Sequence, residues 1–178
     1  MTTPSRLTSI DPTGEFRADL PEYFFMMLFQ VLRRQDAASE KLLKALGLTY
    51  ANWRALLIID RLQPCTMNDL ARISTVERTT LTRTVDQLVA EGLAERSTPP
   101  EDRRQVRICL TPAGAKALDA GREAIYADQR SRLEGLDEQK LREATRLLHG
   151  VLGNLIDDSA TAEAVMTLSR VNRADETD

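Results

Sequence analysis

Apolar residues recur with a helical period over most of the chain. The first stripe begins at residue 20, and its members recur every three or four positions: Leu20, Phe24, Met27, Leu28, Val31 and Leu32. Phe25, Met26 and Phe29 fall outside this stripe, so the predicted helix is apolar nearly all round. Such a helix needs burial on more than one side. The pattern therefore predicts contact with a second subunit, a ligand cavity or both, although a central helix in the core of a monomer also fits.

Turn and capping residues divide the rest of the pattern into further helices. Gly47 can end the first helix, and Asp69 can complete a capping box with Thr66. Four helices each follow a residue that can cap an N-terminus: Thr49, Thr66, Thr111 and Asp137. Pro112 fits the first position of the fifth helix. The predicted helices cover residues 20–47, 50–62, 67–73, 77–91, 112–133 and 138–156.

A short hairpin is predicted between the fourth and fifth helices. Residues 93–97 and 106–110 alternate in polarity as strands do, and the loop between them contains Pro99 and Pro100, which would break a helix. The order of a short helix, a tight turn, a longer helix and a hairpin predicts a mainly α fold with a small β-hairpin wing, a winged helix-turn-helix. Ser74 lies in the turn, where a left-handed backbone would strain a serine.

The longer helix has two distinct faces. Its apolar side chains, Leu81, Val85 and Leu88, fall on an inward stripe, and the opposite face carries Thr79, Thr82, Arg83 and Asp86. An α-helix fits the major groove of DNA, arginine pairs with guanine through two hydrogen bonds, and threonine contacts bases or the thymine methyl group. The outward face therefore suggests that this helix reads DNA.

If the longer helix reads DNA, the positive charge that binds DNA must be concentrated at one place on the protein, because the protein as a whole is acidic. The chain of 178 residues is 42% hydrophobic and 29% charged, with a formal net charge of −3. Residues 66–111 hold seven basic residues, Arg72, Arg78, Arg83, Arg96, Arg103, Arg104 and Arg107. They also hold seven acids, Asp69, Glu77, Asp86, Glu91, Glu95, Glu101 and Asp102. DNA binding would thus depend on where the arginines point, and a solvated run of charge is the alternative.

The motifs TTLTRTVDQL, EGLAER and DRRQVRICLTPAG resemble the DNA-binding lobe of the MarR family of bacterial transcription regulators. The resemblance extends over roughly residues 20–156 and implies a homodimer that binds a pseudo-palindromic operator, usually as a repressor. It implies that Arg104 enters the minor groove, that Asp102 holds its pose, and that Arg103 and Arg107 contact phosphates. Arg78, on the longer helix, is also expected at the DNA. No cofactor is implied.

The resemblance also sets the expected organisation. Residues 1–19 would be a flexible arm, 20–47 and 112–158 a helical dimerisation region, 48–111 the winged helix-turn-helix lobe, and 159–178 a polar tail. The dimer would bury Leu28, Val31, Leu147, Leu148 and Leu152. An effector pocket between the dimer helices and the lobe would draw on Phe25, Phe29, Arg33, Trp53, Arg54, Leu57 and Tyr126. These residues suit a small aromatic acid or its coenzyme A thioester.

Other classes of function have weaker support. The lone histidine, His149, lies among leucines, and there is no metal-ligand cluster, P-loop or nucleophile elbow, so an enzyme is not expected. Cys65 and Cys109 would be neighbours if the segment before the third helix pairs with the returning strand, which leaves a redox-responsive regulator as an alternative. A winged-helix module that binds another protein is a further alternative. Two cysteines do not make a disulfide framework, so a reducing cytoplasm is the expected setting. No apolar run is long enough to span a bilayer, so no membrane contact is expected.

Overall fold

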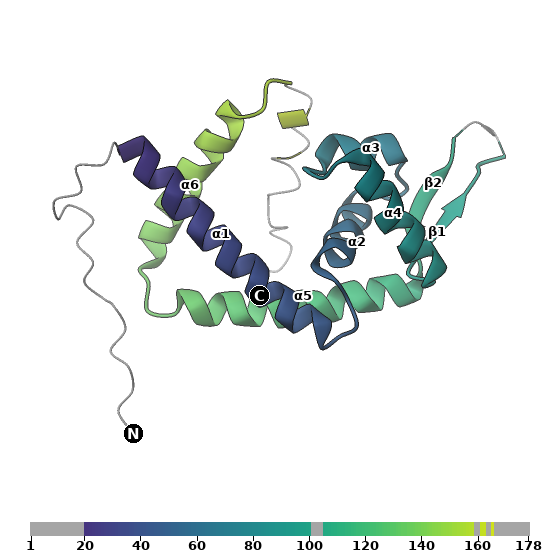
Figure 1. Cartoon of the computed structure of the whole chain (residues 1–178), viewed down its shortest axis with the longest axis horizontal. Coiled ribbons are helices and arrows are strands. Elements are labelled where there is room, and N and C mark those ends of the chain that lie inside the picture. Colours follow the sequence, from purple (N-terminus) through teal and green to yellow (C-terminus); the bar gives the residue numbers. More distant parts are fainter. Residues whose placement is uncertain (1–19, 101–104, 159–160, 163–164, 166–178) are drawn as a thin grey trace, which may run out of the picture. The chain divides into compact units, whose positions relative to one another are not determined.

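The computed structural model describes residues 20–100, 105–158, 161–162 and 165 (Figure 1). Its elements follow the predicted order: α1 (Leu20–Lys44), α2 (Tyr50–Leu62), α3 (Met67–Ile73), α4 (Arg78–Ala90), β1 (Ala94–Ser97), β2 (Arg107–Leu110), α5 (Pro112–Leu133) and α6 (Glu138–Asn154). The chain divides into two compact units, residues 1–38 and 39–178, so the first part of α1 is described by itself.

The second unit contains the winged helix-turn-helix that the sequence predicts. Helix α2 packs against α3, α4, α5 and β2, while β1 contacts α4. The two strands pair antiparallel, from Ala94 opposite Leu110 to Ser97 opposite Arg107, and they project beside α4 in Figure 1. Cys65 forms an isolated bridge with Ile108, which adds the expected short third partner to the returning strand. The first helix ends at Lys44, three residues before the predicted end at residue 47, and the other limits differ by a residue or two.

Local sequence fixes the ends of the helices. The Thr66 side chain accepts a hydrogen bond from the backbone N–H of Asp69 at 3.2 Å, and Asp69 Oδ2 accepts one from the backbone N–H of Thr66 at 2.9 Å. This reciprocal pair is the predicted capping box. The side chains of Thr49 and Asp137 cap α2 and α6. Gly47, beyond the end of α1, has a φ of 74°, the left-handed conformation expected after a helix.

The core of the second unit lies among α2, α3, α4 and β2. The predicted inward residues of α4, Leu81, Val85 and Leu88, are all buried. They belong to a cluster that includes Leu56, Ile59, Leu70 and Ile108, each at most 1% exposed. Because the whole inward stripe of α4 is used to hold the helix on the lobe, its opposite face is presented outward.

The segment from Leu110 to Gly114 joins the wing to α5 through a close backbone contact. Thr111 Oγ1 donates to the Gly92 carbonyl at 2.6 Å and accepts from the Gly114 N–H at 3.0 Å. A Cβ atom on residue 114 would lie 1.8 Å from the Leu93 carbonyl oxygen. Thr111 and Gly114 therefore let α5 begin directly against the base of the wing, which explains the LTPAG motif.

Ser74 does not carry the strain that the sequence suggested. Its backbone has φ −71° and ψ 135°, an extended conformation that any residue adopts. The Ser74 hydroxyl oxygen accepts a hydrogen bond from the Val76 N–H at 3.1 Å. The turn between α3 and α4 is therefore made by an extended residue and a local side-chain hydrogen bond, so it needs no glycine.

Two helical segments expose apolar side chains. In the first unit, the part of α1 up to Ala38 exposes Phe25, Met26, Met27, Phe29, Val31 and Leu32 within its own chain. In the second unit, no residue of α6 is buried, and Leu147 and Leu155 are 68% and 65% exposed. Leu28 and Leu152 are half-buried. Among the described residues, no helix is long and apolar enough to cross a membrane.

Candidate nucleic-acid interface

The outward face of α4 carries the side chains that the sequence assigned to DNA. Thr79 and Arg83 are exposed, and Thr82 is half-buried. The Thr82 hydroxyl donates to the Arg78 carbonyl at 2.9 Å, one turn earlier on the same helix. Because its proton is engaged in the helix, the hydroxyl oxygen can only accept a further hydrogen bond, while the methyl group stays available for apolar contact. Thr82 thus suits a base amino group or a thymine methyl group.

Ion pairs leave the positive charge of the lobe unevenly distributed. Arg96 on β1 pairs with Asp86 of α4 at 2.7 Å, and Arg72 pairs with Asp69 at 3.8 Å. Within the described part of residues 66–111, the remaining arginines form no ion pair: Arg78, Arg83 and Arg107. The acid that the sequence placed on the outward face, Asp86, is therefore neutralised by the wing, and unpaired positive charge remains on α4 and β2.

A side-chain pair that the sequence did not predict joins α3 to α4. Arg78 Nη2, at the first position of α4, donates to Asn68 Oδ1 at 2.9 Å, and both residues are exposed. Asn68 follows the first residue of α3. Ten residues separate the two partners, and the pairing depends on the turn at 74–77, so no local sequence signal marks it.

The wing is described only near its base. Asp102, Arg103 and Arg104, which the resemblance placed at the DNA backbone and minor groove, lie outside the described residues. Arg107 opens β2 and is half-buried, and Val106 before it is 46% exposed. Among the described residues of the wing, Arg107 is the one that was predicted to contact DNA.

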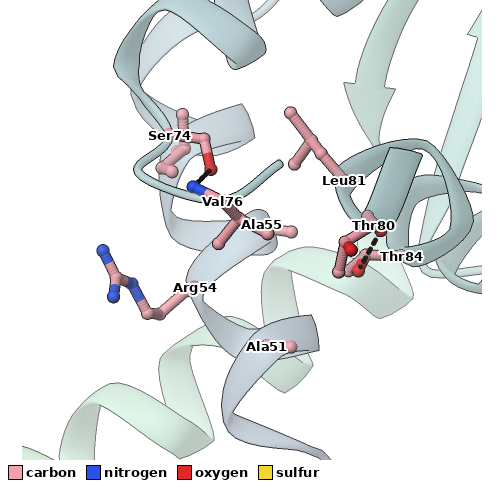
Figure 2. A pocket seen from close by; sticks show the side chains of 9 residues that line it. Ala51, Arg54, Ala55, Ser74, Val76, Thr80, Leu81 and Thr84 are labelled. Atoms are coloured by element: carbon pink, nitrogen blue, oxygen red, sulfur yellow. Dashed lines mark hydrogen bonds between the residues drawn. The ribbon is translucent and has the colours of Figure 1, made fainter. Parts of the chain in front are cut away.

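A small cavity lies between α2 and α4, next to the turn (Figure 2). Its volume is about 50 Å³, and its walls include Ala55, Val76, Leu81 and Thr84. The Thr84 hydroxyl donates to the Thr80 carbonyl at 3.0 Å, which leaves the walls mostly apolar. Typical sites for drug-sized ligands have volumes of roughly 300–1,000 Å³, so this cavity is too small for the predicted effector.

A larger hollow on the surface of α2 includes two residues of the predicted effector set. Its volume is about 260 Å³, and it is lined by Arg54, Leu57, Ile58, Arg61, Ile73, Thr75 and Val165. Arg54 and Leu57 were predicted to bind the effector, whereas Arg61 and Ile73 were not. Arg54 and Arg61 share this hollow with the apolar side chains of Leu57, Ile58 and Ile73. The i, i+7 spacing of the two arginines on α2 is a sequence signal that could have indicated Arg61.

Trp53 and Tyr126 of the predicted effector set belong to the second unit but do not line this hollow. Trp53 is only 6% exposed, and its ring is stacked on Tyr50 with the ring centroids 6.1 Å apart. It does not line the hollow, so its main role is in the core. Tyr126 on α5 is 40% exposed. Phe25, Phe29 and Arg33 lie on the separately described part of α1, where both phenyl rings are exposed.

An ion pair joins helices α2 and α5. Arg122 Nη2 of α5 lies 2.7 Å from Asp60 Oδ2 of α2, and both side chains are about two-thirds buried or more. Burial lowers the pKa of Arg122, but the hydrogen bond and the charge of Asp60 outweigh it, so the pKa of the guanidinium is raised. Arg122 therefore stays charged and ties the lobe to the long helix that follows the wing.

The bridge from Cys65 to Ile108 brings Cys65 next to the strand that contains Cys109, and both cysteines are free thiols. Cys65 is buried and Cys109 is half-buried. Burial, with smaller contributions from Asp69 and Cys109, raises the pKa of Cys65 to about 11. Its thiol donates to the Ile108 carbonyl at 3.6 Å. A reactive thiol needs a lowered pKa and access to solvent, and Cys65 has neither. The geometry thus argues against a redox pair.

Metal ligands and the lone histidine are the residues that bear on enzyme chemistry. The described residues contain no group of three or more His, Cys, Asp or Glu side chains that could hold a metal ion. His149 is half-buried on α6, among the apolar residues of that helix.

Taken together, the fold and its outward helix define a winged helix-turn-helix protein of the DNA-binding type. A model of the MarR family matches residues 48–106. The chain is 33% identical to the solved transcriptional regulator PA3341, with a TM-score of 0.67 over 75% of this chain and 98% of that one. It is also similar to a mutant MarR from E. coli solved with operator DNA, at 26% identity and a TM-score of 0.64 over 76% of this chain and 99% of that one.

A curated relative gives the same result. The HTH-type transcriptional repressor IacR of Pseudomonas putida is 26% identical over 146 residues, which cover 82% of this chain and 86% of that one. The chain belongs to the MarR family of transcription regulators. This confirms the family that the wing and helix motifs indicated.

Proposed function

We propose that this regulator is a homodimeric repressor that binds a pseudo-palindromic operator through α4 and is released by a small organic anion. One observation carries the DNA-binding role: Arg78 and Arg83 on α4 form no ion pair within the described lobe, whereas Asp86 is neutralised by Arg96. A segment with no net charge, residues 66–111, can thus present positive charge where a helix enters the major groove. The E. coli relative solved with operator DNA supports the same partner.

The unburied face of α6 supports a dimer. Leu147 and Leu155 are exposed in the single chain, and exposing several large leucines on one amphipathic helix to water is unfavourable. A second copy would cover them, together with Leu148, Leu152 and the apolar residues Leu28 and Val31 of α1. Stable homodimers often bury roughly 2,000 Å² or more, and two long helices per subunit can supply such a surface. Sedimentation of the purified protein should give a dimer.

The hollow on α2 supports an effector with a carboxylate. Arg54 and Arg61 can bind an anionic group by charge-assisted hydrogen bonds, while Leu57, Ile58 and Ile73 can pack on an apolar ring. A volume of about 260 Å³ fits a small aromatic acid. A coenzyme A thioester would extend out of it, so the acid is the effector we favour. IacR is named as a repressor, which supports the direction of control.

The effector would act by favouring a spacing of the two α4 helices that does not match the operator. A preference of about 3 kcal/mol for that state would weaken DNA affinity more than a hundredfold. The hollow is bounded by α2 and by the turn at Ile73 and Thr75, which leads into α4. A ligand there would therefore act on the segment that positions the DNA-reading helix.

A gel-shift series with a duplex selected from a random library tests this function. Arg83→Ala should cost about 1–3 kcal/mol per half-site and relax the base preference at one position. Arg142→Ala, which removes an arginine paired with Glu138 on α6, is the control and should leave binding unchanged. Equal affinity of wild type and Arg83→Ala for every duplex would refute the role of α4.

Adding aromatic acids, their coenzyme A thioesters or peroxide to the same assay tests the effector. Release by an acid should be lost in Arg61→Ala and kept in Arg130→Ala, which changes an exposed arginine of α5. If peroxide alone releases the DNA, and Cys65→Ser or Cys109→Ser abolishes that release, the thiol-based alternative is correct.

A further inference from the structure

The hydrogen bond between Asn68 and Arg78 is not needed to hold the core. Both side chains are exposed, and the core beneath them is made by Leu70 and Leu81, which are 1% and 4% exposed. The neighbouring acid, Asp69, is already engaged by Thr66 and Arg72. Arg78 is therefore held by a neutral amide and keeps its full positive charge uncompensated within the described residues.

The direction of this hydrogen bond determines what the pair offers to a partner. The amide oxygen of Asn68 is the acceptor, at 2.9 Å from Arg78 Nη2. The amide then has its two N–H groups left, and a guanidinium carries five N–H donors and no acceptor. The outer surface of the pair consequently consists of N–H donors with a net positive charge. Such a surface is suited to an oxygen anion and poorly suited to a base edge with mixed donors and acceptors.

The position of the pair relates it to the DNA-reading face. Arg78 is the first residue of α4, one turn before Thr82 and next to Thr79. Asn68 belongs to α3, so the pair bridges the two helices of the helix-turn-helix. When α4 lies in a major groove, groups at its N-terminal edge that also reach α3 are next to the groove wall, where the phosphates lie.

We propose that Asn68 and Arg78 form a clamp for one phosphate of the DNA backbone. Asn68 has two roles in it: it orients the guanidinium through Oδ1, and it donates an Nδ2 hydrogen bond to the same phosphate. The clamp adds a backbone contact that does not depend on base sequence, next to the base contacts of Thr82 and Arg83. The inference rests on the proposed DNA-binding function.

The test measures operator affinity and its dependence on salt for three variants. Asn68→Asp keeps an acceptor for Arg78 but replaces the donor with a negative charge, Asn68→Ala removes both roles, and Arg78→Ala removes the cation. Gln139→Ala, an exposed amide paired with Glu143 on α6 at 3.2 Å, is the matched control. Each variant is first shown to keep its circular dichroism spectrum and its sedimentation coefficient. The duplex is one selected by the wild-type protein from a random library, with a scrambled duplex beside it.

The clamp predicts equal losses on both duplexes. Asn68→Asp should weaken binding roughly tenfold or more, and Arg78→Ala should lower the slope of log affinity against log salt by about one for each half-site. Asn68→Ala should lose several-fold in affinity with its base preference unchanged, and adding it to Arg78→Ala should cost little more. Gln139→Ala should match wild type.

Three results would overturn the clamp. Unchanged affinity in Asn68→Ala, with wild-type binding intact, removes Asn68 from the interface. A changed base preference in Arg78→Ala, with an unchanged salt slope, makes Arg78 a base reader. Fully additive losses in the double variant show that the two residues act separately. In contrast, a wild-type protein that selects and binds no duplex refutes the proposed function itself, so the two failures are distinguishable.

Discussion

The indole ring of Trp53 on α2 lies directly against the backbone of Gly121 on α5. A Cβ atom on residue 121 would be 2.5 Å from Trp53 Cδ1 and 2.6 Å from Nε1. Real Cβ atoms do not come so close to other heavy atoms, so α2 and α5 reach this separation only because residue 121 has no side chain. The contact joins the DNA-binding lobe to the helix that leads away from it.

Gly121→Ala should therefore destabilise the protein, although alanine favours helix more than glycine does. We expect a loss of about 1–3 kcal/mol, the usual cost of overpacking a well-filled site. Urea unfolding followed by circular dichroism measures it. The matched comparison is the same change in a Trp53→Leu background, where the smaller side chain leaves room for the methyl group. An equal loss in both backgrounds would mean that the tryptophan is not the cause.

The pair formed by Asp60 and Arg122 should contribute a measurable coupling energy. Their side chains are 31% and 28% exposed, which shields them from water more than an ordinary surface pair. A double-mutant cycle with Asp60→Asn and Arg122→Gln should give about 1 kcal/mol. The pair Asp128–Arg132, within one helix and more exposed at the arginine, is the reference and should couple less. Coupling no larger than that of the reference would show that the Asp60–Arg122 pair is solvated.

Asp69 should make stability depend on pH in the acid range. Hydrogen bonds from the backbone and side chain of Thr66 lower the pKa of Asp69 below its ordinary value of 3.8, with burial opposing them and Arg72 helping. A carboxylate whose pKa is lower in the folded state than in the unfolded state stabilises the fold at pH values above its unfolded-state pKa. That stabilisation is lost as the pH falls through the folded-state pKa. Wild type should thus be more stable than Asp69→Asn at pH 7, and the difference should shrink below about pH 4. A difference that stays constant with pH would contradict this origin.

Cys65 should be nearly inert in the folded protein. With a pKa of about 11, roughly one Cys65 thiol in a thousand is ionised at pH 8, and the residue is 2% exposed. Labelling with a chromogenic disulfide should be slow in Cys109→Ser and become fast in urea. Cys65→Ser, which keeps only the half-buried Cys109, should react faster under native conditions. If Cys65 in Cys109→Ser reacts as fast under native conditions as in urea, the thiol is accessible and the redox-responsive alternative is supported.

Features that depend on neighbouring residues were predictable from the sequence. The capping box at Thr66 and Asp69, the glycine after α1, and Thr111 with Pro112 at the start of α5 all act within a few positions, so the residue types alone specify them. The apolar stripe of α4 likewise specifies which face is buried. The helix order and the winged helix-turn-helix class follow from these local signals.

Contacts between distant side chains were not predictable in the same way. The sequence showed seven acids and seven bases in residues 66–111, but only the fold reveals that Asp86 is paired with Arg96 and that Arg78 is paired with Asn68. The members of the predicted effector set on α2 are divided for a related reason. Trp53, Arg54 and Leu57 are neighbours on one helix, but α5 covers Trp53, while Arg54 and Leu57 face the hollow. Which side of α2 meets another helix is a tertiary property.

The packing of Trp53 also gives the protein an optical label of its own. Trp53 is the only tryptophan in the chain, so the indole emission of the protein comes from this one position. It is buried, and its Nε1–H has no hydrogen-bond partner among the described residues, so its emission should lie toward the blue. Any rearrangement that separates α2 from α5 would admit water to the ring and shift the spectrum to the red. A ligand that causes such a rearrangement can thus be followed by wavelength alone, with no dye attached.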